Sequence, residues 1–264
     1  MNTKNFFLTA VLSLCGLGVL TSCGSNEDNN SINPLSGQIA GRWVTVEYGG
    51  QAAITDEKVM FNFVSSDKCL VTMLLGDDEE LGGWIKDAPF DVTINGHVVT
   101  MSGQVTETIS SIYELHINSI VSNDMLCNLK MTDINNGEVS VDECSAHFAR
   151  ATANHSEEII GTWEGDYCWD DVMIRSRFVF KEDGTYNFYY FNSGGWKQSA
   201  DDFSFYSCHG DMIYMHWKNT GMDADCEGWD ITDIGRGVMK WHALRVGEND
   251  STYEVTTEFT KVQD

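Results

Sequence analysis

The tripeptides Gly41-Arg42-Trp43 and Gly161-Thr162-Trp163 open two stretches of this chain that follow the same pattern. An isoleucine comes shortly before each tripeptide, at Ile39 and at Ile159. After each tripeptide, short segments of alternating apolar and polar residues are separated by glycine-containing turns. The two tryptophans therefore mark equivalent starting points, 120 residues apart at positions 43 and 163.

Three later markers recur in the same order when the two stretches are aligned on these tryptophans. The pairs are Phe61-Asn62-Phe63 with Phe178-Val179-Phe180, Gly82-Gly83-Trp84 with Gly194-Gly195-Trp196, and Phe148-Ala149-Arg150 with Phe259-Thr260-Lys261. Their offsets shrink slowly along the chain, as expected when a duplicated segment gains and loses residues in its loops. The chain is therefore predicted to contain one module of about 110 residues twice, at 38–151 and at 157–264.

Within each module the apolar residues repeat with a period of two, which is the spacing of a strand that buries one face. In the first module Tyr113, Leu115 and Ile117 alternate with polar residues, as Val255 and Phe259 do in the second. Asn-Gly and Asp-Gly pairs between such runs supply the positive φ angles that tight hairpins need. The predicted fold class is all-β: two tandem, small, antiparallel up-and-down β-barrels.

A G-x-W sequence at the first strand, with a basic residue at the end of the last strand, resembles the lipocalin (calycin) family. The resemblance covers both modules and implies eight-stranded barrels in which the tryptophan closes one end and the basic side chain packs across its ring. By position it implies that Trp43 meets Arg150 and that Trp163 meets Lys261. A cation over an indole face contributes about 0.5–2 kcal/mol to such a closure. The modules are shorter than is usual in that family, and no helix follows the last strand.

The start of the chain has the features of an export signal. Lys4 precedes an apolar stretch that is too short to span a bilayer, and residues 1–22 are interpreted as a lipoprotein signal peptide. Leu20-Thr21-Ser22-Cys23 resembles a bacterial lipobox, so Cys23 is the predicted lipidation site; the alternative is an ordinary signal peptide with an incidental cysteine. Residues 23–37 are polar and glycine-containing, which predicts a flexible tether.

These features predict an outer-membrane lipoprotein of a Gram-negative cell that contacts the membrane through its lipid anchor alone. The acidic pair Glu27 and Asp28, just after the lipid site, favours display on the cell exterior and leaves the periplasmic face open. A net charge of −24 argues against nucleic acid and against adsorption to anionic headgroups, because both need basic surface.

Six cysteines follow the predicted lipid site, three in each module. They are Cys69, Cys127, Cys144, Cys168, Cys208 and Cys226. Because three is odd, at least one thiol per module is expected to stay free or to pair across the modules.

The two modules differ in aromatic content, with eight Phe, Trp and Tyr residues in the first and twenty in the second. Such a surplus predicts an aromatic binding surface for a small lipophilic molecule or a glycan, with a filled barrel as the alternative. The candidate ligand-binding residues are Trp169, Tyr186, Phe188, Tyr190, Trp196, Phe205, Tyr214, Trp217 and Trp241.

One acidic run partly follows the spacing of a calcium loop, with Asp223, Asp225, Glu227 and Asp230 around a glycine. Isoleucine stands where the bidentate acid of such a loop would fall, and an acidic hairpin tip is the alternative that we favour. No other cofactor is predicted.

No sequence signature of catalysis is present, and seven histidines occur outside any catalytic spacing. The sequence therefore predicts no enzyme. It predicts a lipid-anchored binding protein of the cell envelope that holds a small apolar or amphipathic molecule in the second module. The alternative is a surface interaction module in which exposed aromatics such as Trp84 and Trp196 bind a glycan or a protein partner.

Overall fold

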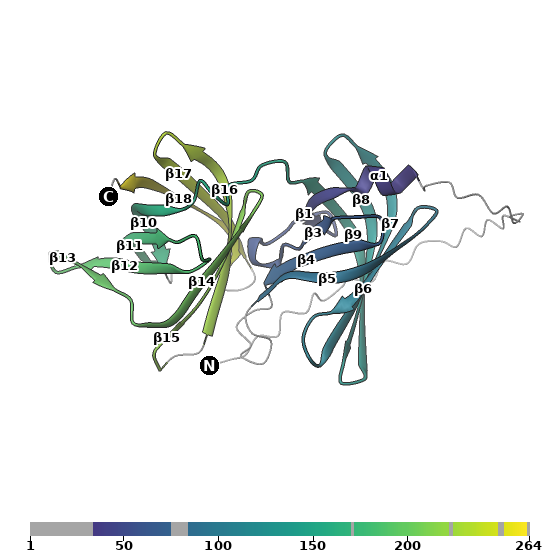
Figure 1. The fold of residues 1–264 in the computed structure, drawn as a ribbon, viewed down its shortest axis with the longest axis horizontal. Helices are drawn as coiled ribbons and strands as arrows, with labels where there is room; N and C mark the ends of the chain where they lie inside the picture. Colours follow the sequence, from purple (N-terminus) through teal and green to yellow (C-terminus); the bar gives the residue numbers. More distant parts are fainter. Residues whose placement is uncertain (1–33, 75–83, 170–171, 222–223, 248–250, 263–264) are drawn as a thin grey trace, which may run out of the picture.

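The computed structural model describes residues 34–74, 84–169, 172–221, 224–247 and 251–262, apart from the side chains of Trp84 and Trp169. The fold is all-β, as predicted, with two antiparallel sheets formed by the two halves of the chain (Figure 1). The predicted signal peptide, the lipidation site Cys23 and tether residues 23–33 lie outside the described residues.

The first sheet is a closed eight-stranded barrel, called barrel 1 below. Each strand pairs with the next along the chain, and β9 returns to β1 to close the ring. A short strand, β2, adds a hairpin arm to β1. The strands are β1 (Gly41–Tyr48), β2 (Gln51–Ala52), β3 (Met60–Phe63), β4 (Lys68–Leu74), β5 (Trp84–Asn95), β6 (Val98–Gln104), β7 (Ile109–Val121), β8 (Asp124–Asn135) and β9 (Glu138–Arg150).

The second sheet is a curled half-barrel with the order β13-β12-β11-β10-β18-β17-β16-β15-β14. Its first and last strands in sequence, β10 and β18, pair with each other, as β1 and β9 do in barrel 1. The strands are β10 (Gly161–Trp169), β11 (Val172–Phe180), β12 (Tyr186–Asn192), β13 (Gly195–Gln198), β14 (Asp201–His209), β15 (Met212–Asn219), β16 (Ala224–Gly235), β17 (Val238–Val246) and β18 (Thr252–Val262).

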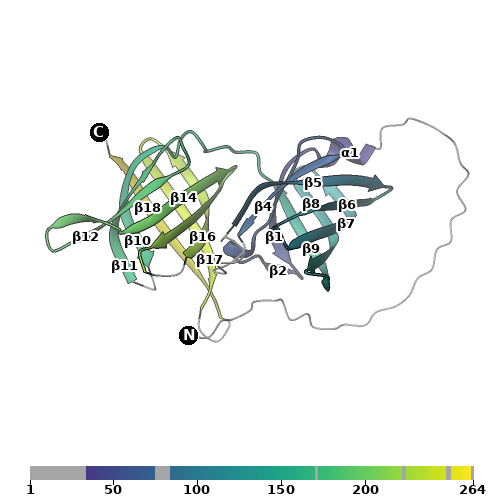
Figure 2. The same cartoon turned by 60° about the horizontal axis from the view of Figure 1, so that its bottom comes forward.

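The second module differs from the expected barrel at one seam. Among the described residues, β12 and β14 form no continuous ladder, and an isolated bridge joins Thr185, just before β12, to Phe205 of β14. The reason is that β13 pairs with the outer half of β12, from Tyr189 to Asn192, and occupies the edge that β14 would need. The β12–β13 hairpin instead extends away from the half-barrel, on the side far from barrel 1 (Figures 1 and 2).

One end of barrel 1 is closed by Trp43 and Arg150. Trp43 is fully buried, and its indole N–H donates to the carbonyl of Ile39 at 2.8 Å. The guanidinium carbon of Arg150 lies 4.2 Å from the centroid of the Trp43 ring, and the same group donates to the carbonyl of Gln38 at 2.7 Å. The arrangement therefore combines a cation over an indole with a cap on the carbonyls that precede β1.

The half-barrel repeats this arrangement at the equivalent positions. Trp163 donates to the carbonyl of Ile159 at 2.7 Å, and the Lys261 ammonium lies 5.0 Å from its ring centroid. The same ammonium lies 3.3 Å from the carbonyl of Glu158. Two closures with the same partners at the same spacing support the duplication inferred from the sequence.

A short helix, α1 (Pro34–Ile39), precedes barrel 1. Its Leu35 and Ile39 side chains are buried in the barrel core, so the helix covers the end that Trp43 closes. The tether predicted over 23–37 is therefore too long at its C-terminal side, because residues 34–37 already belong to α1. None of the helices in the described ranges is both long and apolar enough to cross a membrane.

Barrel 1 is filled by its own side chains. Phe61 lies at its centre, with ring centroids 5.3 Å from Tyr113 and 5.4 Å from Phe148. In the half-barrel, the deep part of the interior is filled in the same way around Trp241, whose ring lies 4.6 Å from Phe259 and 5.6 Å from Trp229. The interior around Trp241 therefore leaves no space for a ligand.

Cys69, Cys127, Cys144 and Cys208 are free thiols. Burial raises the pKa of the thiols of Cys69, Cys127 and Cys208 to about 12. The expectation of at least one free thiol per module is confirmed by Cys69 in the first module and Cys208 in the second.

Candidate binding site

The half-barrel contains a recess beside its incomplete seam. The inner cavity measures about 20 Å³, enough for about one water molecule. The recess opens to solvent at its mouth, and its enclosed volume is well below the usual range for small-molecule sites of about 300–1,000 Å³. Its walls are Tyr167, Phe178, Tyr186, Phe188, Ser199, Asp201, Met215, Trp217 and Glu227.

The aromatic walls of the recess come from neighbouring strands β10, β11 and β12. The ring of Tyr167 lies 5.3 Å from that of Phe178 and 5.8 Å from that of Phe188, both edge to face. Tyr186 completes this side, 6.0 Å from Phe178. Across the recess, β15 contributes Met215 and Trp217. These side chains alternate with outward residues along their strands, which is why period-two sequences bring them to one interior.

Glu227 places a carboxylate in this aromatic interior. Its side chain retains only 15% exposure, and its Oε1 accepts a hydrogen bond from the Tyr167 hydroxyl. Oε2 lies 3.6 Å from a guanidinium nitrogen of Arg245, beyond hydrogen-bonding distance. Burial raises the pKa of Glu227 above its ordinary value, although Arg245, Tyr167 and the indole of Trp229 all act to lower it. The anionic form is thus incompletely compensated by the protein.

Asp201 supplies a second carboxylate at the mouth of the recess. It accepts hydrogen bonds from the hydroxyl of Ser199 at 2.6 Å and from that of Ser204 at 2.8 Å. Burial raises the pKa of the Tyr186 hydroxyl well above its ordinary value, and the carboxylates of Glu227, Asp201 and Asp225 raise it further. The Tyr186 hydroxyl therefore stays protonated at neutral pH.

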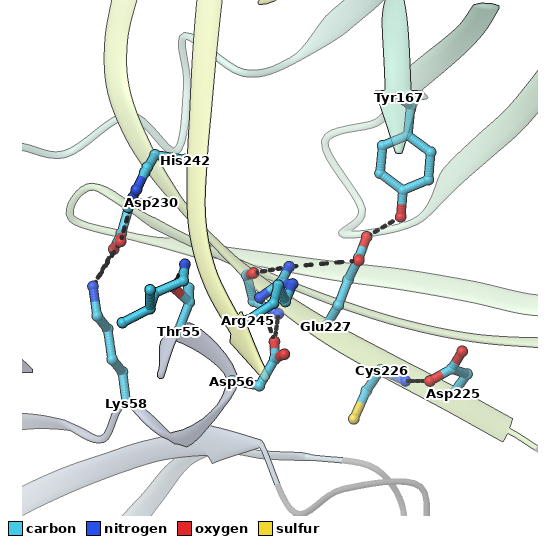
Figure 3. Close-up of polar contacts among 12 residues, drawn as sticks. Thr55, Asp56, Lys58, Tyr167, Asp225, Cys226, Glu227, Asp230, His242 and Arg245 are labelled. Carbon is cyan, nitrogen blue, oxygen red and sulfur yellow. Dashed lines mark hydrogen bonds and ion pairs between the residues drawn. The ribbon is translucent and has the colours of Figure 1, made fainter. Parts of the chain in front are cut away.

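A turn of barrel 1 contacts the half-barrel next to this recess. The strands β16 and β17 pair with each other only between the Asp230–His242 pair and the turn that connects them. Before that pair, residues 224–229 of β16 pair with β15 alone. The 3-10 turn η1 (Thr55–Glu57), called the wedge below, lies between the two separated strands. Figure 3 shows how its residues reach both of them.

The wedge satisfies backbone groups that a continuous β16–β17 ladder would otherwise use. Asp56 accepts a hydrogen bond from the N–H of Gly228 at 2.6 Å, and the Thr55 hydroxyl accepts one from the N–H of Leu244 at 2.8 Å. Lys58 forms an ion pair with Asp230 at 2.6 Å. A Cβ atom on Gly228 would lie 3.2 Å from the Thr55 carbonyl oxygen, so the close approach depends on glycine. The wedge thus replaces part of the sheet.

Arg245 joins the wedge to the recess (Figure 3). Its guanidinium lies 3.0 Å from Asp56, donates to the Gly228 carbonyl at 2.7 Å, and stands 4.7 Å above the ring of Trp229. The same group faces Glu227 inside the recess. One buried cation is therefore shared between a carboxylate of barrel 1 and a carboxylate of the candidate site.

An apolar cluster completes the contact between the halves. It consists of Val44, Met60 and Leu74 from barrel 1 with Met212 and Tyr214 from the half-barrel. Tyr214, one of the predicted ligand-binding residues, is fully buried in this cluster.

The structure brings three of the nine predicted ligand-binding residues to the recess, namely Tyr186, Phe188 and Trp217. Trp241 belongs to the deep core, and Tyr190 packs against that core without lining the recess. Trp196 lies on β13 under Arg177, whose guanidinium is 4.4 Å from its ring, and Phe205 is 43% exposed. The side chain of Trp169 lies outside the described residues.

The acidic run predicted as a calcium loop forms part of a strand, since β16 begins at Ala224. Glu227 faces the recess, whereas Asp230 points to the opposite face and binds Lys58 of barrel 1. Asp225 is exposed, and Asp223 lies outside the described residues. Among the residues that are described, no three His, Cys, Asp or Glu side chains gather closely enough to hold a metal ion. The acids therefore serve separate contacts.

Sequence reasoning missed Tyr167, Phe178, Ser199, Asp201 and Met215 as lining residues. Glu227 was identified, but as a ligand for a cation loop. Nothing in the spacing of the sequence links Tyr167 to Glu227, because they lie 60 residues apart on strands that are not neighbours in the sheet. Only the curl of the half-barrel brings them together.

No protein-family model matches the chain, and a search of curated proteins finds no match either. The assignment of a function therefore depends on the recess and on the features of the sequence.

The raised pKa of Glu227 leads to a prediction about stability. A carboxyl group with a raised folded-state pKa stabilises the folded protein most at pH values below its ordinary pKa of 4.5, and this contribution disappears as the pH rises through the folded-state pKa. In Glu227→Gln the contribution is absent at every pH, while the side chain still accepts the Tyr167 hydrogen bond. We therefore expect the melting temperature of Glu227→Gln, relative to the unmodified protein, to increase from pH 4 to pH 8.

Differential scanning calorimetry at several pH values measures this difference. Glu254→Gln removes an exposed carboxylate from β18 and serves as the control, with a difference that stays flat over the same range. A flat difference for Glu227→Gln as well would show that its carboxyl group titrates normally.

Proposed function

We propose that this protein is a ligand-binding lipoprotein of the cell envelope, and that the recess of the half-barrel holds a small amphipathic molecule without changing it chemically. The observation that carries the proposal is the composition of the recess. Its walls are mostly aromatic, and Glu227, Asp201, Tyr167 and Tyr186 are among the residues that line it. Concave apolar walls with a few convergent polar groups are typical of small-molecule sites.

The size of the recess limits the ligand. The enclosed part of the recess, about 20 Å³, holds about one water-sized group, so the proposed ligand is small and lies partly in the open mouth. The proposal places no ligand in barrel 1, because aromatic and aliphatic side chains fill its interior.

The lipocalin-like class is part of the proposal. Its support is the up-and-down strand order of both sheets and the repeated closure by Trp43 with Arg150 and by Trp163 with Lys261. Anchoring through Cys23, and location at the outer membrane of a Gram-negative cell, are supported by the lipobox-like sequence and by the polar segment after it.

Binding without catalysis is supported by the protonation of the recess. Burial raises the pKa of both Tyr167 and Tyr186 well above the ordinary range of a tyrosine hydroxyl. Both hydroxyls are therefore neutral at physiological pH, and they act as hydrogen-bond donors rather than as nucleophiles.

The alternative of an exposed aromatic platform has weaker support. Arg177 and Arg175 lie over the Trp196 ring, at 4.4 and 5.5 Å from its centroid, and cover one face of it. Phe191 stands edge to face against the same ring at 5.5 Å. A tryptophan held in this way stabilises the β12–β13 hairpin and offers less free surface to a glycan.

A single substitution tests the proposed site. We expect Trp217→Ala to weaken binding of benzyl alcohol, a small neutral aromatic probe, by about tenfold, because truncation of a ligand-contacting aromatic costs 1 kcal/mol or more. Ligand-observed NMR titration of the purified protein gives the affinity.

Trp196→Ala is the matched control, because it removes the same side chain outside the recess. It should leave the affinity unchanged. If Trp196→Ala weakened binding and Trp217→Ala did not, the surface module would be the better description.

A further inference from the structure

We infer that the recess selects small organic cations, and that the carboxylate of Glu227 is the group that recognises their positive charge. This inference rests on the proposed function and specifies its ligand class. It follows from the charges in the recess, the partners of Arg245 and the aromatic walls.

The charges of the recess are unbalanced toward negative. Glu227 and Asp201 line it, and Asp225 acts on the hydroxyl of Tyr186 from the same side. Arg245 is the cation that faces Glu227, but its guanidinium binds Asp56 at 3.0 Å and the Gly228 carbonyl at 2.7 Å. Its charge is therefore shared with a carboxylate that lies outside the recess, on the wedge.

The hydrogen bonds of Glu227 leave room for an additional donor. Tyr167 donates to Oε1, whereas the nearest guanidinium nitrogen is 3.6 Å from Oε2. Burial keeps the pKa of the Glu227 carboxyl above its ordinary value, although Arg245, Tyr167 and the indole of Trp229 all act to lower it. A ligand ammonium would supply the donor and the positive charge that the anionic carboxylate lacks, since charge-assisted hydrogen bonds are about twice as strong as neutral ones.

The aromatic walls suit the same ligand. Faces of tryptophan and tyrosine rings attract cations that lie within about 6 Å of the ring centroid. Trp217, Tyr186 and Tyr167 provide such rings next to the carboxylates. The chain uses this interaction elsewhere, with Arg245 over Trp229 at 4.7 Å and Lys261 over Trp163 at 5.0 Å. The net charge of −24 also raises the local concentration of cations at the mouth of the recess.

The test compares two probes of nearly equal shape, benzylammonium and benzyl alcohol, by isothermal titration calorimetry at pH 7 and low salt. We expect benzylammonium to bind about 10–100-fold more tightly, because hydrogen bonds to charged groups are worth about 1.5–3 kcal/mol. In Glu227→Gln the ratio of the two affinities should fall to within about threefold. Glu254→Gln, which removes one exposed carboxylate on β18, should keep the full preference.

A second measurement distinguishes the effect of the Glu227 carboxylate from the effect of the protein's net negative charge. Because a bound cation lowers the pKa of a neighbouring carboxyl, binding of benzylammonium should release a fraction of a proton, and the binding enthalpy should vary with the ionisation enthalpy of the buffer. Glu227→Gln should abolish that dependence.

Each remaining outcome has a distinct meaning. If both probes bind equally and Glu227→Gln changes neither affinity, the recess is a binding site without charge selection; the inference is overturned and the proposed function stands. If the alcohol binds and the ammonium does not, the inference is again overturned. If neither probe binds at millimolar concentration, the proposed function fails together with the inference.

Discussion

Arg245→Met should lower the free energy of unfolding by about 3 kcal/mol at neutral pH, because it leaves the buried carboxylate of Glu227 facing Asp56 with no cation between them. Methionine keeps much of the volume that packs over Trp229. The estimate is at the low end for breaking a buried ion pair, since both side chains retain 13–15% exposure. Thermal unfolding should show a decrease in melting temperature of about 6–12 °C.

The loss should depend on pH in a defined direction. Without Arg245, the folded-state pKa of Glu227 rises further, so the destabilisation is small near pH 4, where the carboxyl group is protonated, and increases as the pH rises. Lys240→Met, on the same strand, removes an exposed ion pair with Glu258 and should cost at most about 1 kcal/mol. A loss that is equal at pH 4 and pH 7 would mean that Arg245 acts through packing alone.

Trp43→Ala should destabilise the protein by about 3–5 kcal/mol, the range for truncating a fully buried large aromatic. The indole fills the end of barrel 1, donates to the Ile39 carbonyl at 2.8 Å and carries the Arg150 guanidinium on its face. Its removal therefore opens a cavity, leaves a buried carbonyl without its donor and releases α1 from the barrel end. Chemical denaturation with near-UV circular dichroism measures the loss.

Trp163→Ala offers a matched comparison, because Trp163 has the same partners in the half-barrel. Its loss should be of similar size. Trp43→Phe keeps most of the packing and removes the N–H, so it should cost only about 1–3 kcal/mol. A loss under 1 kcal/mol for Trp43→Ala would show that the barrel end is not closed by this residue.

The fold was predictable because its determinants are local or repeat along the chain. Period-two segments such as Tyr113 to Ile117 indicated strands, and the equivalence of Trp43 with Trp163 located both modules. The open seam was not predictable, since it depends on β13 pairing with the outer half of β12 in preference to β14. Two strands competing for one edge have no signature in the residues of either strand.

The site was predictable in part for the same reason. Tyr186, Phe188 and Trp217 lie on strands whose alternation could be read, and their aromatic character indicated a binding surface. Glu227 was considered for a cation loop, with an acidic hairpin tip as the favoured alternative, because linear spacing does not distinguish acids on alternate faces of a strand from acids around a turn. Asp201 and Tyr167 become its neighbours only through the curvature of the sheet.

The wedge lay beyond sequence reasoning altogether. Thr55 and Asp56 bind groups 172 and 189 residues further along the chain, and Gly228 has no feature that marks it as a point of close approach. Physically, the contact requires two strands to separate and a turn of another barrel to fill the gap. The separation of the strands and the insertion of the turn depend on how the two sheets pack, and not on the secondary-structure propensity of any segment.

The free thiols of this chain have a consequence for its chemistry. With pKa values near 12, Cys69, Cys127 and Cys208 are ionised in only about one molecule in ten thousand at pH 8. Because thiolate is the form that attacks a disulfide, oxidants meet a reactive sulfur at these positions mainly when a sheet opens. The rate at which they are alkylated is therefore set by the frequency of local opening of the sheet. Alkylation of Cys69 and Cys127 reports opening of barrel 1, and alkylation of Cys208 reports opening of the half-barrel.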